Sequence, residues 1–189
     1  MRCFVAVAIP GAVRAALGDV QASLRDRLHG ARWVRPEGIH LTLRFLGEID
    51  ETMRDSLGKS LRDPVKRCGP AFALRIGGVG TFPPRGRPRV LWIGLESPVD
   101  DPQALDRLAV LQSSLERTVH AAGLAPETRP FHPHLTLARF DERGPRAEIA
   151  GSEGGVIAGQ RLPVESVRLY RSTLSRSGAT YDVLEEYPL

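Results

Sequence analysis

The pattern of apolar and polar residues predicts three helices set among short strands. Residues 2–9 form a nearly continuous apolar run, which is typical of a buried strand. Apolar residues then recur every three or four positions from Val13 to Leu28, and Gly30 stands where a glycine commonly ends a helix. Residues 31–34 indicate a second, short strand.

Two more helices are expected later in the chain. One begins at the capping residue Asp50 and stops at Pro64, with an apolar face made of Met53, Leu57 and Leu61. The other begins at Asp101 and Pro102, which suit the cap and the first helical position, and ends at Gly123. Its inward residues are expected to be Leu105, Leu108, Leu115 and Val119.

The remaining apolar stretches predict strands. They lie at 38–46, 71–79, 90–95, 133–140, 162–174 and 179–187, with a hairpin-length turn at 175–178. Residues 141–160 are rich in glycine and polar residues, and we assign no element to them. The short connections between strands favour antiparallel pairing with the helices outside.

We therefore expect an α+β fold with two pseudo-symmetric lobes of antiparallel sheet, helices outside and a central cleft. No linker separates the lobes, so residues 1–189 are expected to form a single bilobal domain.

Composition narrows the class of protein. The chain has 189 residues, of which 42% are hydrophobic and 25% charged, as is ordinary for a globular protein. No apolar run approaches the roughly 18 residues of a membrane helix, and two cysteines make no disulfide framework. We expect a monomeric cytoplasmic protein without a membrane segment.

The formal net charge of +4 is carried mainly by arginine. Arginine suits bidentate contacts to phosphate, so an anionic partner is consistent with it. A GC-rich genome gives the same bias without any function, and we favour that cause. The segment from Gly80 to Pro88 bears Arg85 and Arg87, with Arg89 at its end; it is most simply a solvated turn, although it could cover an anionic substrate.

One motif occurs twice. Arg35-Pro36 leads, after three residues, to His40-Leu41-Thr42-Leu43, and Arg129-Pro130 leads in the same way to His134-Leu135-Thr136-Leu137, 94 residues later (134 − 40). Side chains alternate along a strand, so in each copy the histidine and threonine share one face while the leucines share the other. Two such halves could bring two imidazoles and two hydroxyls to one phosphate.

Blander interpretations must be weighed against this hypothesis. The repeat could be a remnant of gene duplication kept for packing, but packing explains only the leucines and not a repeated ionisable residue. His132 and His134, with His40 as a third ligand, could instead bind a metal. No Cys, Asp or Glu stands beside either motif at ligand spacing, so we favour a site without a metal or another cofactor.

The two motifs resemble the signature of the two-histidine (2H) phosphoesterase superfamily. Within it, the chain is similar to the RNA 2′,3′-cyclic phosphodiesterases, also called 2′-5′ RNA ligases. The similar segments cover nearly the whole chain: Arg2 to Ala6, Trp33-Val34, His40 to Gly47, Phe82-Pro83, Val90 to Trp92, Pro133 to Arg139 and Leu169 to Ser172.

This resemblance implies a metal-independent hydrolysis of RNA 2′,3′-cyclic phosphate ends to 2′-phosphomonoesters, with reversible 2′-5′ ligation. It implies that His40 is the proton donor to the leaving 3′ oxygen and His134 the proton acceptor that activates water, with Thr42 and Thr136 on the phosphate oxygens.

The resemblance also implies that Arg139 contacts the phosphate, and we expect Phe45 to be a second substrate-binding residue. Strict alternation from His134 places Arg139 on the opposite face of its strand, so its role requires a bulge or a strand end. Two alternatives remain open. One is a module that binds RNA ends without turnover, and the other is an enzyme for small cyclic phosphates such as ADP-ribose 1″,2″-cyclic phosphate.

Overall fold

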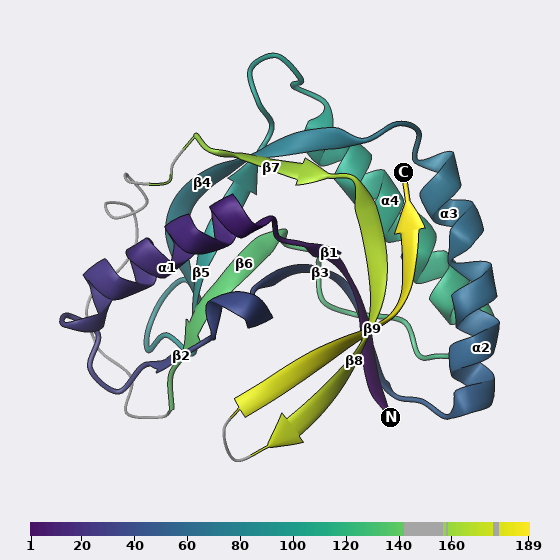
Figure 1. The fold of residues 1–189 in the computed structure, drawn as a ribbon, viewed down its shortest axis with the longest axis horizontal. Helices are drawn as coiled ribbons and strands as arrows, with labels where there is room; N and C mark the ends of the chain where they lie inside the picture. The colour runs from purple at the N-terminus through teal and green to yellow at the C-terminus, as the bar shows by residue number, and fades with distance from the viewer. Residues whose placement is uncertain (142–156, 158, 176–177) are drawn as a thin grey trace.

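A single curled sheet of antiparallel strands organises the chain in the computed structural model, which describes residues 1–141, 157, 159–175 and 178–189. The strand order is β7-β4-β5-β6-β3-β1-β8-β9, and the short β2 pairs with β6 (Figure 1). The strands are β1 (Arg2–Ala8), β2 (Arg32–Trp33), β3 (His40–Glu48), β4 (Phe72–Phe82), β5 (Val90–Glu96), β6 (His134–Arg139), β7 (Arg161–Val164), β8 (Ser166–Ser175) and β9 (Gly178–Pro188).

The strand order divides at its centre into two equivalent halves. One half runs outward from β3 through β1, β8 and β9, and the other runs outward from β6 through β5, β4 and β7. The two copies of the repeated motif therefore lie on the two central strands. The expected α+β fold with pseudo-symmetric antiparallel lobes is confirmed.

Helices cover one face of the sheet. They are α1 (Gly11–Arg25), α2 (Glu51–Ser60), α3 (Arg62–Arg67) and α4 (Ala104–Ala121), and η1 (Pro36–Gly38) is a single 3₁₀ turn before β3. Their apolar sides and the inward side chains of both sheet halves form one hydrophobic cluster. The other face of the two central strands carries the histidines and threonines. The helices therefore pack against the face of the sheet opposite to the candidate catalytic residues.

Several expected boundaries were wrong. Pro64 does not stop the second helix, because α2 ends at Ser60 and Pro64 lies buried in the first turn of α3. Proline is tolerated there since its missing N–H has no partner in a first turn. The cap at Asp50 is confirmed, for its carboxylate accepts the Met53 N–H at 2.7 Å.

The ends of α1 and α4 also differ from expectation. Helix α1 ends at Arg25, well before Gly30, although the φ of +79° at Gly30 still lets the chain turn there. Helix α4 begins at Ala104 rather than at Pro102, and the Ala104 N–H donates to the carbonyl of Asp101 at 3.2 Å. Leu105 is only partly buried, whereas Leu111 is fully buried in the core.

The stretch 162–174 is two strands and not one. Strand β7 pairs with β4 at one edge of the sheet, and β8 pairs with β1 in the other half. A continuous apolar pattern cannot reveal a chain that changes partners at Glu165. Most of the unassigned stretch 141–160 lies outside the described residues, as do positions 176–177 of the expected turn.

Candidate active site

The two His-x-Thr segments lie side by side on antiparallel strands. Leu41 of β3 pairs with Leu135 of β6, and both leucines are fully buried. The same register, continued one residue either way, places the histidine of each strand opposite the threonine of the other. These four side chains are half-buried, on the face away from the leucines. The sequence expectation that they share one surface is therefore met by the backbone geometry.

A β-bulge interrupts β3 just after the first motif. Val5 pairs with Arg44 while its neighbour Ala6 pairs with Thr42, so Leu43 is an extra residue on β3. Leu43 and Arg44 are consequently both buried on the helix side. The alternation then resumes out of phase, and Phe45 returns to the face of the histidine with 47% of its surface exposed.

The second motif carries the same bulge. Leu91 pairs with Ala138 while Trp92 pairs with Thr136, which leaves Leu137 as the extra residue on β6. Leu137 and Ala138 are both buried, and Arg139 is exposed. Strict alternation would have turned Arg139 away from the histidines, and the bulge turns it toward them. Phe45 and Arg139 therefore occupy equivalent positions in the two halves.

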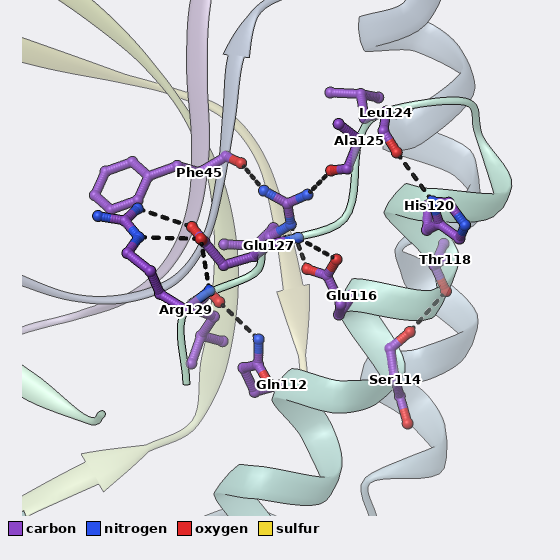
Figure 2. Close-up of polar contacts among 12 residues, drawn as sticks. Phe45, Gln112, Ser114, Glu116, Thr118, His120, Leu124, Ala125, Glu127 and Arg129 are labelled. Atoms are coloured by element: carbon purple, nitrogen blue, oxygen red, sulfur yellow. Dashed lines mark hydrogen bonds and ion pairs between the residues drawn. The ribbon is translucent and has the colours of Figure 1, made fainter. Parts of the chain in front are cut away.

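Two glutamines hold these bulges from behind. The Gln21 amide on α1 donates to the Leu137 carbonyl at 2.9 Å. The Gln112 amide on α4, labelled in Figure 2, donates to the Leu43 carbonyl at 3.4 Å. Gln21 is almost completely buried and also donates to the Val34 carbonyl at 2.7 Å. Because a bulge disturbs the ladder of backbone hydrogen bonds, a helix side chain is needed to pair its carbonyl.

Both imidazoles are oriented in the same way. Nδ1 of His40 lies 2.8 Å from the Gly38 carbonyl, and Nδ1 of His134 lies 2.7 Å from the His132 carbonyl. A carbonyl can only accept, so Nδ1 carries the hydrogen in each ring. Nε2 is then the nitrogen that can take or give a proton.

His40 lies among aromatic rings. Phe4 stacks on it at 4.5 Å between centroids, Tyr181 meets it edge-on at 5.2 Å, and the Tyr170 ring lies 6.3 Å away. Burial among these rings lowers the pKa of His40 to about 4, because the charged form loses its hydration. The hydrogen bond to Gly38 opposes this change, and the charge of Arg139 adds to it.

His134 has a corresponding set of aromatic neighbours. Phe82 meets it edge-on at 5.1 Å, and Trp92 lies 6.2 Å away. Burial is again the main reason that the pKa of His134 is lowered, while the His132 carbonyl raises it and the charges of His132 and Arg139 lower it. The charge of Arg139 thus contributes to the lowered pKa of both histidines.

Comparison with known proteins decides the family. The sequence matches the LigT like Phosphoesterase family over residues 7–92 and 99–181. The chain belongs to this family. The expected resemblance to the 2H phosphoesterases is thereby confirmed.

Relatives extend over the full chain. The RNA 2′,3′-cyclic phosphodiesterase of Thermus thermophilus is 37% identical over 100% of this chain and 90% of its own length. The crystal structure of TT0787, also from Thermus thermophilus, superposes with a TM-score of 0.79 at 33% identity, covering 100% and 98% of the two chains. E. coli LigT, solved with 3′-AMP, gives a TM-score of 0.78 at 26% identity, covering 100% and 97%.

The site of this LigT-like protein contains residues that the sequence alone did not reveal. The aromatic residues around each histidine received no role, namely Phe4, Tyr170 and Tyr181 on one side and Phe82 and Trp92 on the other. Most stand in the segments that carry the resemblance, but only the sheet brings them against the imidazoles. Gln21 and Gln112 gave no signal, since a glutamine on a helix is ordinarily solvated.

The arginine that leads the second copy of the motif pairs with a nearby carboxylate. Arg129 is exposed and forms an ion pair with Glu127 at 2.9 Å (Figure 2). The Glu127 N–H in turn donates to Glu116 at 2.9 Å, and Glu116 pairs with the buried Arg44. This chain of contacts fastens the segment before β6 to helix α4.

The His132 and His134 rings lie 6.3 Å apart between centroids, and Phe82 contacts both. Among the residues that the structure describes, no group of three or more His, Cys, Asp or Glu is placed to hold a metal ion. Within the same part of the chain, the helices are too short or too polar to cross a membrane.

Proposed function

We propose that this LigT-like phosphoesterase hydrolyses RNA 2′,3′-cyclic phosphate ends to 2′-phosphomonoesters. The observation that carries the proposal is the pair of imidazoles on adjacent strands, each with Nδ1 anchored to a carbonyl and Nε2 left for proton transfer. The curated relative from Thermus thermophilus is an RNA 2′,3′-cyclic phosphodiesterase, which supports the same substrate. Displacement at phosphorus needs a base on one side and an acid on the other.

In the proposed reaction, a water molecule attacks phosphorus opposite the 3′ oxygen. Nε2 of His134 takes a proton from this water, the new P–O bond forms, and the P–O3′ bond breaks. Nε2 of His40 gives its proton to the 3′ oxygen as it leaves. The products are a 2′-phosphomonoester and a 3′ hydroxyl, and the pair of histidines has exchanged one proton. When the 5′ hydroxyl of a second strand takes the place of water, the same steps form a 2′-5′ phosphodiester and release the 3′ hydroxyl, and the reverse of that reaction restores the cyclic phosphate.

We assign the phosphate oxygens to Thr42, Thr136 and Arg139. Each threonine stands across from the histidine of the other strand, so a phosphate between the two imidazoles lies within reach of both hydroxyls. Arg139 faces the same surface because of the bulge at Leu137 and supplies a fixed positive charge. Donors that are already in place when charge develops on the phosphate stabilise the transition state.

We assign Phe45 to the nucleoside. Its ring lies 6.2 Å from that of Phe4, which stacks on His40, so an apolar surface continues from the imidazole to the exposed side of β3. A ribose or a base can pack on such a surface without a sequence-specific hydrogen bond.

The test is turnover with assignment of the product. Purified protein is incubated separately with a nucleoside 2′,3′-cyclic phosphate, with a short RNA that ends in one and with ADP-ribose 1″,2″-cyclic phosphate, and phosphorus NMR distinguishes the 2′- from the 3′-phosphomonoester. We expect turnover of the nucleoside and RNA substrates to the 2′ product only. Binding without turnover would favour an RNA-end-binding module, and turnover restricted to ADP-ribose 1″,2″-cyclic phosphate would favour a small-nucleotide enzyme. Either outcome contradicts the proposal.

A further inference from the structure

Two arginines stand directly opposite each other at one end of the sheet. Arg32 of β2 pairs with Arg139 of β6, and the neighbouring pair is Trp33 with Ala138. Ala138 is fully buried and Trp33 packs against the core, so this neighbouring pair faces the helices. Side chains alternate along a strand, and Arg32 and Arg139 consequently face the side of the histidines. Both are exposed.

Like charges directly opposite each other destabilise a sheet. Within the residues that the structure describes, neither Arg32 nor Arg139 forms an ion pair with a carboxylate, whereas many other arginines of the protein do. Two cations paired in register, with no carboxylate partner among the described residues, are suited to bind an anion from outside. The two guanidinium groups come from different strands, so each can bind a different oxyanion.

More positive charge gathers at the same end. The β4–β5 connection approaches the end of β6, and β2 lies alongside β6 at this end (Figure 1). The Phe140 N–H donates to the Arg89 carbonyl at 2.9 Å, which fixes this connection beside Arg139. Arg85 and Arg87 are exposed on the same connection. This arginine-rich end is suited to a polyanion that extends beyond the reacting phosphate.

The chemistry of the substrate limits which second phosphate could bind at this arginine-rich end. A 2′,3′-cyclic phosphate is by definition at the last nucleotide of a strand. The only neighbouring phosphate is therefore the one on the 5′ oxygen of the same nucleoside. It is a diester within an RNA chain and a monoester in a 5′-phosphorylated mononucleotide.

We propose that Arg32 binds the phosphate on the 5′ oxygen of the terminal nucleoside, while Arg139 holds the reacting phosphate. This inference rests on the proposed function for the placement of the reacting phosphate. Arg32 gives the enzyme a preference for ends that carry a second phosphate over a free nucleoside 2′,3′-cyclic phosphate. No base is read by this contact, so the preference is independent of sequence.

Calorimetric binding of product-like ligands tests the proposal without depending on turnover. The ligands are adenosine 2′-phosphate, adenosine 2′,5′-bisphosphate, and the adenosine dinucleotide with a 2′-phosphate at its 3′ end. The variants are Arg32→Gln, Arg32→Lys and the control Arg67→Gln, which removes an exposed arginine from α3. Arg32 is exposed, so its replacement should leave the fold intact, and circular dichroism checks this.

We expect the wild-type protein and Arg67→Gln to bind both two-phosphate ligands about five-fold more tightly than adenosine 2′-phosphate, near the upper range for an exposed ion pair. Arg32→Gln should lose that advantage with less than a two-fold change for adenosine 2′-phosphate, and Arg32→Lys should keep part of it. The slope of log affinity against log salt for the dinucleotide should fall by about 0.7 in Arg32→Gln, as expected for one lost phosphate contact.

Three results would overturn the proposal. The first is equal wild-type affinity for the one-phosphate and the two-phosphate ligands. The second is an unchanged preference of Arg32→Gln for the two-phosphate ligands. The third is an equal loss of affinity for all three ligands in Arg32→Gln, which would assign Arg32 to the reacting phosphate. An advantage seen for the bisphosphate but not for the dinucleotide would overturn the placement of an RNA chain at Arg32. Failure of the proposed function is recognised separately, because it appears as an absence of turnover in the wild-type protein.

Discussion

Substitution of Gly80 by alanine tests whether the rings around His134 are packed as the structure has them. A Cβ atom at Gly80 on β4 would lie 2.3 Å from the ring of Trp92. Trp92 is in contact with the ring of His132 at 4.9 Å and lies 6.2 Å from that of His134. The absence of a side chain at Gly80 thus makes room for the tryptophan that borders the proposed base.

The size of the effect follows from the overlap. Ordinary contacts begin at 3.4 Å, so the indole must retreat by about 1 Å or the strands must separate. Overpacking of this kind costs about 1–3 kcal/mol of folding free energy, which lowers Tm by roughly 2–12 °C for a protein of this size. A displacement of about 1 Å next to a reacting group can lower turnover by up to roughly 10²-fold.

Gly78→Ala is the matched control. Gly78 lies on the same strand, and a Cβ there meets nothing within 4 Å. We expect Gly78→Ala to keep the wild-type Tm and kcat/KM, and Gly80→Ala to lower both, as measured by calorimetry and by hydrolysis of a nucleoside 2′,3′-cyclic phosphate. Identical behaviour of the two variants would refute the packing described here.

Three further outcomes are expected. Arg44→Met should lower the free energy of unfolding by about 3 kcal/mol in urea titrations, since it leaves the Glu116 carboxylate without its cation; a change below about 1 kcal/mol would contradict this. A plot of kcat/KM against pH should be bell-shaped, and kcat/KM reports the ionisation of the free enzyme. Both limbs should lie below about pH 6.5, because the pKa of His40 is lowered to about 4 and the pKa of His134 is also lowered. The productive state carries one proton on the pair, so kcat/KM falls as rising pH removes it, and a plateau to about pH 8 would show that the lowered pKa values are wrong. Activity should survive exhaustive EDTA treatment, and loss that zinc or manganese restores would mean that His132 and His134 bind a metal.

Much of the fold could be read from the sequence, because strand and helix periods and the repeated motif are local signals. The motif predicted that His40 and Thr42 share a face, and the alternation was enough for that. Strict alternation failed to predict the direction of Arg139, because a bulge on β6 shifts the alternation. That bulge depends on the partner strand and on Gln21, which is 116 residues away from Leu137. The resemblance named Arg139 as a candidate, and strict alternation required a bulge or a strand end for it, but the sequence could not say which of the two the chain uses.

Other features required the sheet itself. Two strands occupy 162–174 because β7 and β8 join opposite halves, and no local pattern encodes that exchange of partners. The lowered pKa of His40 depends on Phe4, which is 36 residues away (40 − 4) and reaches the imidazole only through the β1–β3 pairing. Arg32 was unremarked in the sequence and became a candidate only when β2 paired it with Arg139.

The central claim is that His40 and His134 act as a proton donor and a proton acceptor on opposite sides of one phosphate. Alanine at either position should lower turnover of an ordinary 2′,3′-cyclic phosphate by roughly 10²–10⁴-fold. The decisive measurement repeats the assay with a substrate whose 3′ bridging oxygen is replaced by sulfur, a leaving group that needs little protonation. The account predicts that this substrate restores His40→Ala by about 10² or more and leaves His134→Ala impaired. Equal rescue of both variants, or rescue of His134→Ala alone, would contradict the assigned roles.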